Sequence, residues 1–419
     1  MECSVSIDKL GRICSQRREY IYKCKDKVDI IALALVDDLL GIAPCGLESL
    51  AMNTFINVQI EMKKLKFHTP GPDGKTKCHK IHVGRKHEFC PTLLVHGTTM
   101  PAVSSDTYLG DIICGDGTNK SNIESRVLKG QGKIALIMSM IGKISLGKYF
   151  FKIALLLRES IFISSILTNS EVWYRLTKTD AEELEVLDRS LLKRIFSVPN
   201  STPTAALYLE TGCLSIGTII KARRINYLQY LIKLPKEEML SKFFHCQWLD
   251  NKKHDWTEQV RGDLEDFGIE IDLEMIENKS VFSWKQLVKK KAKEFEFGRL
   301  LMVKESKNES KLKKLAYKKL EVQQYLTTMD VKLAKTLFRF RSRTAQFSEN
   351  YKDQGPVDLC PLCGSHSDLQ ELSFKCPVVL EKIELNEEYE NIFKPQVSKE
   401  LANKLQAIEN LRRKKRMNE

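Results

Sequence analysis

Residues 30–42 read IIALALVDDLLGI, and this stretch decides the fold expected for the N-terminal part of the chain. Apolar runs on both sides of Asp37 and Asp38 predict two strands of a hairpin, with the acidic pair at its turn. Adjacent carboxylates repel each other near a core, and a divalent cation with oxygen ligands, such as Mg²⁺, would offset that repulsion. An exposed Asp-Asp turn without a metal is the simpler interpretation of the dipeptide taken alone.

After this hairpin the sequence predicts a mixture of helix and short strands, and then, from about residue 120, long helices. Apolar side chains three or four positions apart predict an amphipathic helix over 49–66, and a loop rich in glycine and proline follows it. Short strands are expected at 78–83, 92–96 and 107–113. Long helices are then expected at 122–146, 149–167 and 179–196, the last with Thr179 as N-cap and Glu182 three residues on.

The composition is that of a basic globular protein. With 419 residues, 42% of them hydrophobic, the chain can form two or three domains, and its net charge is +13. The surplus suits a polyanion such as nucleic acid or an acidic membrane surface, although an ordinary basic protein has the same composition. Residues 149–167 carry charged side chains in an apolar run, so we expect a buried helix there and no membrane span.

The 12 cysteines are expected to be reduced thiols of a protein in the nucleus or the cytoplasm, because the polar residues 1–8 do not resemble a signal peptide. Cys360, Cys363, His366 and Cys376 have the spacing C-x2-C-x2-H-x9-C, which predicts a tetrahedral structural zinc site. Unligated thiols on a loop are the alternative. A weaker cluster that could hold a second metal contains the residues Cys78, His82, Cys90 and His96, for which core cysteines and solvated histidines are the simpler interpretation.

The string ALVDDLLGI resembles the catalytic hairpin of reverse transcriptases, and four later segments resemble further motifs of that family in the same order. Residues 51–67 are similar to the helix after the hairpin, and GKTKCHKIHVG at 74–84 to the motif whose lysine lies near the nucleotide. DTYLGDII at 106–113 resembles the primer-grip hairpin. LTNSEVWY at 167–174 resembles a thumb segment of LINE-type (non-LTR retrotransposon) enzymes. The whole resemblance covers about residues 23–377.

This resemblance implies an α+β fold in which a partial antiparallel palm sheet precedes a mostly helical thumb and connection region and a small zinc module. The implied domains are 1–115 for the palm, 116–345 for the thumb and connection, 346–380 for the zinc module and 381–419 for a charged helix or tail. The LINE-type enzymes often carry a Cys/His module near the C-terminus, but the usual position of their histidine is Leu372 here.

The implied activity is that of an RNA-directed DNA polymerase, with an RNA template, a DNA primer or target and no membrane as partners. Asp37 would ligate Mg²⁺ with support from Asp38, and Lys77 would lie near the nucleotide. The primer end would be held by Tyr108, Leu109 and Gly110. The duplex would be flanked by Arg158, Arg223 and Arg224.

The sequence departs from the family in one respect that concerns activity. The 36 residues before Asp37 contain neither the earlier palm aspartate nor the Gly-rich substrate loop that the family's catalytic site requires. We therefore expect a fragment that is inactive alone. The alternative is a non-catalytic nucleic-acid-binding protein made of the thumb and the zinc module, and a third interpretation is an unrelated zinc-bearing adaptor.

Basic runs in the second half are candidates for contact with phosphate. One contains Lys289, Lys290 and Lys291, and another, FRFRSR at 338–343, alternates phenylalanine with Arg339, Arg341 and Arg343. Arginine binds phosphate bidentately, and aromatic rings stack on unpaired bases. The alternative is that the phenylalanines are core residues and the lysines lie on a solvated helix face. The terminal RRKKR at 412–416 is a nuclear-import or nucleic-acid patch, or a solubilising tail.

Overall fold

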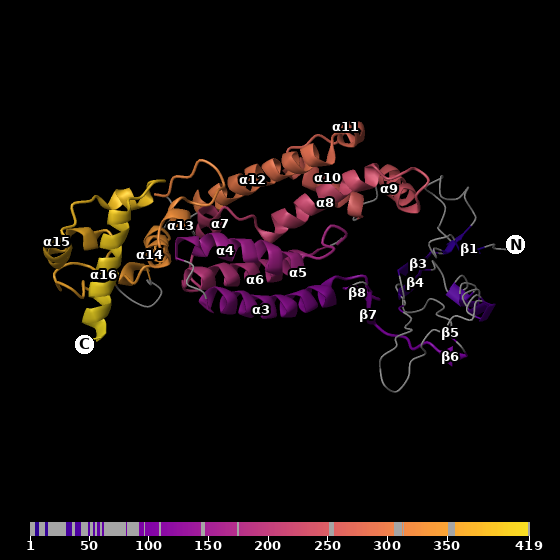
Figure 1. The fold of residues 1–419 in the computed structure, drawn as a ribbon, viewed down its shortest axis with the longest axis horizontal. Coiled ribbons are helices and arrows are strands. Elements are labelled where there is room, and N and C mark those ends of the chain that lie inside the picture. The colour runs from indigo at the N-terminus through magenta and orange to yellow at the C-terminus, as the bar shows by residue number, and fades with distance from the viewer. Residues whose placement is uncertain are drawn as a thin grey trace.

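The fold is that of a computed structural model, drawn in Figure 1. From residue 97 on, the structure describes residues 97–108, 110–143, 147–173, 176–250, 255–305, 314–350 and 357–417, with Leu312. Before residue 97 it describes only short pieces. Asp37, Lys77 and Leu109 lie outside the described residues, and so do all members of the weaker Cys/His cluster.

The N-terminal part contains small antiparallel sheets. Four strands pair in the order β1-β2-β3-β4, with the bounds Val5–Ile7, Ile13–Ser15, Ile31–Leu35 and Asp38–Ile42. Leu35 pairs with Asp38 at the end of β3–β4, which confirms the predicted hairpin. Two shorter hairpins follow, β5–β6 (Leu94–Val95 and Thr98–Thr99) and β7–β8 (Ser105–Tyr108 and Asp111–Cys114).

The turn of the β7–β8 hairpin depends on glycine. Tyr108 pairs with Asp111, so only two residues connect the strands. Gly110 has φ +87°, a backbone conformation that L side chains rarely adopt. Tyr108 and Gly110 therefore lie at a tight turn, and the single strand predicted over 107–113 is two strands of a hairpin, as the resemblance of 106–113 implied.

The helical region begins at residue 120. Its first half contains α3 (Lys120–Lys143), η1 (Gly147–Tyr149), α4 (Phe150–Leu157), the π-helical segment η2 (Arg158–Ile163), α5 (Ser164–Ile166), α6 (Lys178–Phe196) and α7 (Thr204–Thr211). The predicted helix over 149–167 is buried as expected, but a π turn at Arg158 interrupts it. None of the helices described is long and apolar enough to span a bilayer.

The N-cap predicted for α6 was wrong by two residues. The Thr177 hydroxyl accepts a hydrogen bond from the Asp180 backbone N–H at 3.1 Å, and the Asp180 carboxylate accepts one from the Thr177 N–H at 3.0 Å. The reciprocal bonds satisfy two N–H groups at the helix start, and the Thr179–Glu182 pair has the same spacing but lies already inside the helix.

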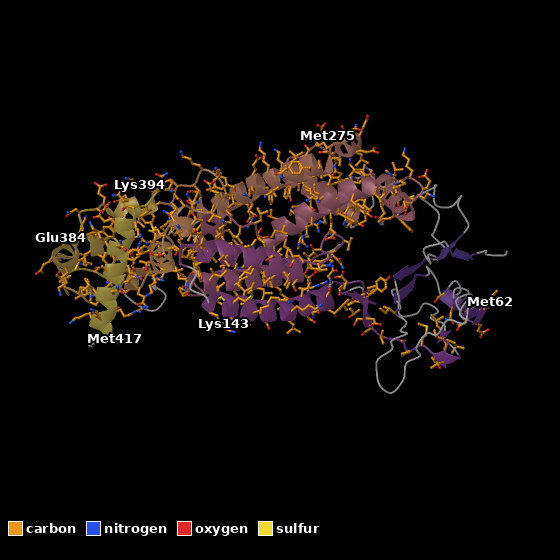
Figure 2. The ribbon with its side chains drawn as sticks, in the orientation of Figure 1. Met62, Lys143, Met275, Glu384, Lys394 and Met417 are labelled. Atoms are coloured by element: carbon orange, nitrogen blue, oxygen red, sulfur yellow. The ribbon has the colours of Figure 1, made fainter. Side chains whose placement is uncertain are left out.

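The second half adds α8 (Ile216–Ile232), α9 (Met239–Asp250), α10 (Trp256–Asp266), α11 (Leu273–Asn278) and α12 (Val281–Glu305). The C-terminal region contains α13 (Tyr325–Thr328), α14 (Val331–Arg341), η5 (Leu372–Lys375), α15 (Pro377–Ile383), η6 (Tyr389–Phe393) and α16 (Lys399–Met417). In Figure 2, Glu384 and Met417 lie at one end of the elongated molecule and Met62 at the other.

The helices enclose two hydrophobic cores. One is shared by α3–α7 and the C-terminal helices, and the other lies among α8–α12. Leu401, Leu405 and Ile408 of α16 are buried in the first core, and α16 packs on α14. The charged C-terminal segment is therefore a docked helix, and the Cys/His segment shares its core with the preceding helices.

Candidate metal centre and predicted nucleic-acid contacts

Three thiols and one imidazole converge in the C-terminal region. The ligand atoms of Cys360, Cys363, His366 and Cys376 all lie within 4.8 Å of one another. Cys360 and Cys376 are buried, and Cys363 and His366 are half-buried. Four soft ligands at this spacing could hold a metal ion such as zinc in a closed, tetrahedral arrangement. The grouping predicted from the spacing is thus present in the fold.

A tight local turn brings the first three ligands together. The Gly364 N–H donates to the Cys360 carbonyl at 2.8 Å, and the Cys360 N–H donates to the His366 carbonyl at 2.7 Å. Gly364 has φ +69°, so the left-handed conformation after the second cysteine favours glycine. A bridge between Leu359 and Ser367 closes the loop into a short hairpin.

The imidazole of His366 is oriented as a metal ligand requires. Its Nδ1 lies 3.0 Å from the Ser367 carbonyl oxygen. Because a carbonyl only accepts, Nδ1 carries the proton and Nε2 keeps its lone pair. This Nε2 is buried and has no hydrogen-bond partner among the described residues. A metal ion would satisfy that nitrogen, and the bond to the carbonyl would fix the ring.

The thiols differ in acidity. Burial opposes ionisation of Cys363, but hydrogen bonds from the hydroxyl and backbone N–H of Ser365 lower its pKa to about 6. Burial raises the pKa of Cys376 to about 11, although the backbone N–H of Val379 acts in the opposite direction. Cys363 therefore supplies a thiolate more readily than Cys376, and a bound cation would have to displace the proton of Cys376.

Cys376 and Asp368 connect this segment to the helices around it. Cys376 is the N-cap residue of α15, and its carbonyl accepts from Val379 and Leu380 at 2.9 Å. Asp368, just after the hairpin, forms a buried ion pair of 2.8 Å with Arg412 of α16. Arg412 also lies over the Phe347 ring at 4.1 Å. The first arginine of RRKKR is thus a buried packing residue, whereas Arg413, Lys414 and Lys415 are exposed.

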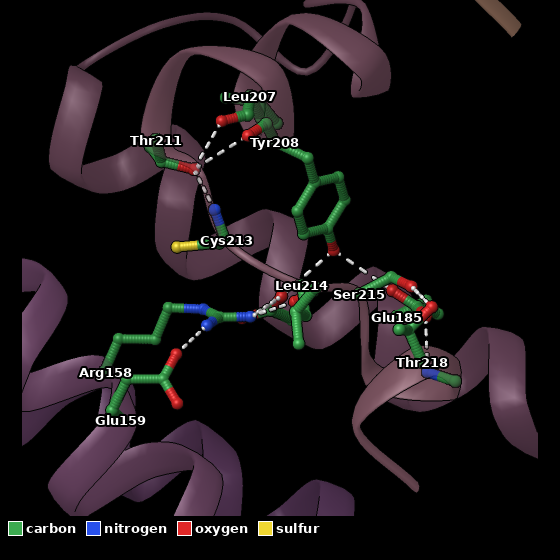
Figure 3. Close-up of polar contacts among 12 residues, drawn as sticks. Arg158, Glu159, Glu185, Leu207, Tyr208, Thr211, Cys213, Leu214, Ser215 and Thr218 are labelled. Carbon is green, nitrogen blue, oxygen red and sulfur yellow. Dashed lines mark hydrogen bonds and ion pairs between the residues drawn. The ribbon is translucent and has the colours of Figure 1, made fainter. Parts of the chain in front are cut away.

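Arg158 occupies an interior position that its sequence context did not predict. Its side chain is 0% exposed and pairs twice with Asp188, Nε to Oδ1 at 2.7 Å and Nη2 to Oδ2 at 2.6 Å. Figure 3 shows its further contacts with Glu159 and the Leu214 carbonyl, and Tyr208 beside Glu185. A guanidinium so enclosed has no free face for phosphate, so we correct its predicted role to a structural one.

Arg224 and Arg341 are also interior ion pairs. Arg224 binds Asp263 with both Nε and Nη2, at 2.7 and 3.1 Å. Arg341, 1% exposed, lies 2.8 Å from the Glu210 carboxylate, which is equally buried. Both arginines were predicted to contact phosphate, but carboxylates of this chain already neutralise them. Removing either carboxylate would leave a buried, unpaired guanidinium.

The remaining predicted arginines are partly exposed but engaged. Arg339 forms an ion pair with Glu409, Arg343 forms one with Glu349 at 2.9 Å, and Arg223 donates to the Leu167 carbonyl. The alternating Phe338 and Phe340 are 0% exposed, which confirms their interpretation as core residues. FRFRSR is therefore a helix end in which phenylalanines fill the core and arginines bind carboxylates.

The lysines of α12 keep the surface position that was predicted. Lys289 and Lys290 are exposed. Lys290 lies 3.9 Å and Lys291 3.3 Å from the Glu294 carboxylate. Lys289 therefore retains the most available charge of the three.

Asp111 joins segments that sequence reasoning treated separately. One of its oxygens accepts from Arg126 at 2.7 Å and from Asn122 at 3.1 Å, both on α3, and lies 3.4 Å from the Trp173 indole nitrogen. Its other oxygen accepts from Asn169 at 2.5 Å. Asp111 immediately follows the Tyr-Leu-Gly turn, yet no spacing rule pairs it with residues 58 and 62 positions away.

No family model, curated protein or solved structure matches this chain.

Proposed function

We propose that this chain is the end of the palm, the thumb and the zinc module of an RNA-directed DNA polymerase of the LINE type, and that its helical part holds nucleic acid. In this proposal Asp37 and Asp38 would hold Mg²⁺, Lys77 would lie near the nucleotide, and the Tyr108–Gly110 turn would hold the primer end.

The observation that supports this proposal most directly is the bonding of Asp111. By the resemblance to LINE-type enzymes, the Tyr-Leu-Gly hairpin belongs to the palm and the 167–174 segment belongs to the thumb. The Asp111 carboxylate accepts hydrogen bonds from Asn169 and contacts Trp173, and the Arg126 guanidinium donates to both Asp111 and the Gly110 carbonyl. A primer-holding hairpin needs a fixed orientation relative to the thumb, and a partly buried, charge-assisted cluster would supply it.

In this proposal the metal centre binds zinc and is structural. Three thiolates and one imidazole complete a tetrahedron and leave no open position for a substrate. Through Asp368 and Arg412 the site would help dock α16 against the first core.

The alternative function is a non-catalytic nucleic-acid-binding protein built from the same parts. Both functions require a surface that binds phosphate, so one experiment tests their shared element. The full chain is titrated onto a labelled RNA–DNA hybrid at increasing salt. We expect log affinity to fall linearly with log salt, by about 0.7 to 0.9 per phosphate contact.

A pair of lysine variants makes this test specific. Lys289→Ala should reduce the slope by about 0.7 to 0.9. Lys319→Ala is the matched control, because its exposed ammonium lies 2.9 Å from the Glu321 carboxylate, and it should leave the slope unchanged. Absence of binding at low salt, or an affinity that does not depend on salt, would contradict the proposed function.

A further inference from the structure

Three aromatic rings form a ladder on α8 and at the start of α10. The rings of Tyr227 and Tyr230 are stacked, with centroids 5.5 Å apart and planes inclined by 22°. Trp256 meets Tyr227 edge-on at 5.8 Å and 89°. The Trp256 indole N–H donates to the Glu171 carbonyl at 2.7 Å. The inner end of the ladder is thus held by the 167–173 segment that also reaches Asp111.

The outer end of the ladder is open to solvent. Tyr230 is 53% exposed, whereas Tyr227 is half-buried. Stacking on Tyr227 restricts the rotation of the Tyr230 ring. The exposed ring is therefore a flat apolar surface that is partly oriented before anything binds, which lowers the entropic cost of stacking a second flat group on it.

Cations precede and follow the two tyrosines along the same helix, with Lys233 at its C-cap. Arg223, Tyr227, Tyr230 and Lys233 follow one another at intervals of four, three and three residues, which places them on one side of α8. Lys233 is exposed, while Arg223 donates to the Leu167 carbonyl and to Ser170. The negative charge of Glu171 acts on Arg223, whereas Lys233 has no ion-pair partner among the residues that the structure describes. Lys233 therefore contributes the positive charge beside Tyr230.

We propose that the outer face of Tyr230 stacks an unpaired base of single-stranded nucleic acid, with Lys233 contacting an adjacent phosphate. A preformed aromatic surface beside a cation matches a base attached to its phosphate, and every base has a π face. The proposal rests on the nucleic-acid binding proposed above and adds a site for unpaired bases. It involves none of the interior arginines.

The test compares two oligonucleotides of equal length and charge. The full chain is titrated onto a labelled oligodeoxyadenylate and onto the corresponding abasic strand, at one low salt concentration. We expect the wild type to prefer the strand with bases. Tyr230→Ala should weaken binding of that strand by about 5- to 150-fold and leave the abasic affinity unchanged, because only stacking is lost.

Control variants separate stacking from charge and from folding. Tyr230→Phe keeps the ring and should retain the preference, and Lys233→Ala should weaken both strands equally. Phe282→Ala removes a different exposed aromatic residue, 75% exposed on α12, and should leave the preference unchanged. Circular dichroism establishes that each variant is folded.

Each other outcome overturns the inference. If the wild type binds both strands equally, or Tyr230→Ala weakens both equally, phosphate alone is bound and the wider proposed function remains. If neither strand nor the hybrid duplex binds, the proposed function fails too. If Tyr230→Ala changes only the sedimenting mass, the ladder is a contact between copies of this chain.

Discussion

Phe338→Ala tests whether FRFRSR belongs to the core or to a base-stacking surface. Phe338 is 0% exposed, and its ring stacks on Phe196 with centroids 3.9 Å apart. Phe196 in turn contacts Phe151, with ring centroids 4.9 Å apart, so the three rings pack together in the first core. Truncation loses the transfer free energy of the ring and leaves a cavity among side chains that cannot all move. We expect a loss of about 3 to 5 kcal/mol in the free energy of unfolding.

The assay is urea unfolding followed by circular dichroism, with oligonucleotide affinity measured in parallel. Phe282→Ala is the matched control, since that ring is 75% exposed and its removal should change stability by less than about 0.5 kcal/mol. Phe338→Ala should bind nucleic acid with unchanged affinity under conditions where it is folded. An unchanged urea midpoint together with weakened binding would refute the reasoning, because it would put Phe338 on the binding surface.

Three further predictions concern the polar sites. Chelation should unfold the C-terminal region, since structural zinc supplies folding free energy on the order of 10 kcal/mol, and identical melting curves with and without chelator would count against a structural metal. Asp111→Asn should cost about 3 kcal/mol by leaving the buried Arg126 guanidinium without a carboxylate partner, and a melting temperature equal to that of the wild type would contradict this role. Burial raises the pKa of Glu185 above 4.5, so the folded protein holds this proton more tightly than the unfolded chain. That stabilisation is fully present below pH 4.5 and is lost as pH rises through the raised pKa, so Glu185→Gln should flatten this part of the stability curve in urea titrations at several pH values.

Local patterns in the sequence predicted the parts of this protein that depend on neighbouring residues. The apolar runs around Asp37 and Asp38 predicted the β3–β4 hairpin because side-chain period and turn chemistry act over a few residues. The long helices followed from their apolar period, although capping moved one start from Thr179 to Thr177. The spacing of the cysteines indicated the metal cluster because a short loop brings the first three ligands together whatever surrounds them.

Only the tertiary structure decided which charged and aromatic side chains face the interior. Arg158 and Asp188 are 30 residues apart, Arg412 and Asp368 are 44 apart, and Arg341 and Glu210 are 131 apart. The residues next to an arginine in the sequence do not show whether the arginine binds a phosphate or a carboxylate from a distant part of the chain. Burial strengthens such a pair and makes its loss costly, but long-range packing determines whether it is buried. For the same reason the open end of the ring ladder at Tyr230 could be recognised only after the helices were placed.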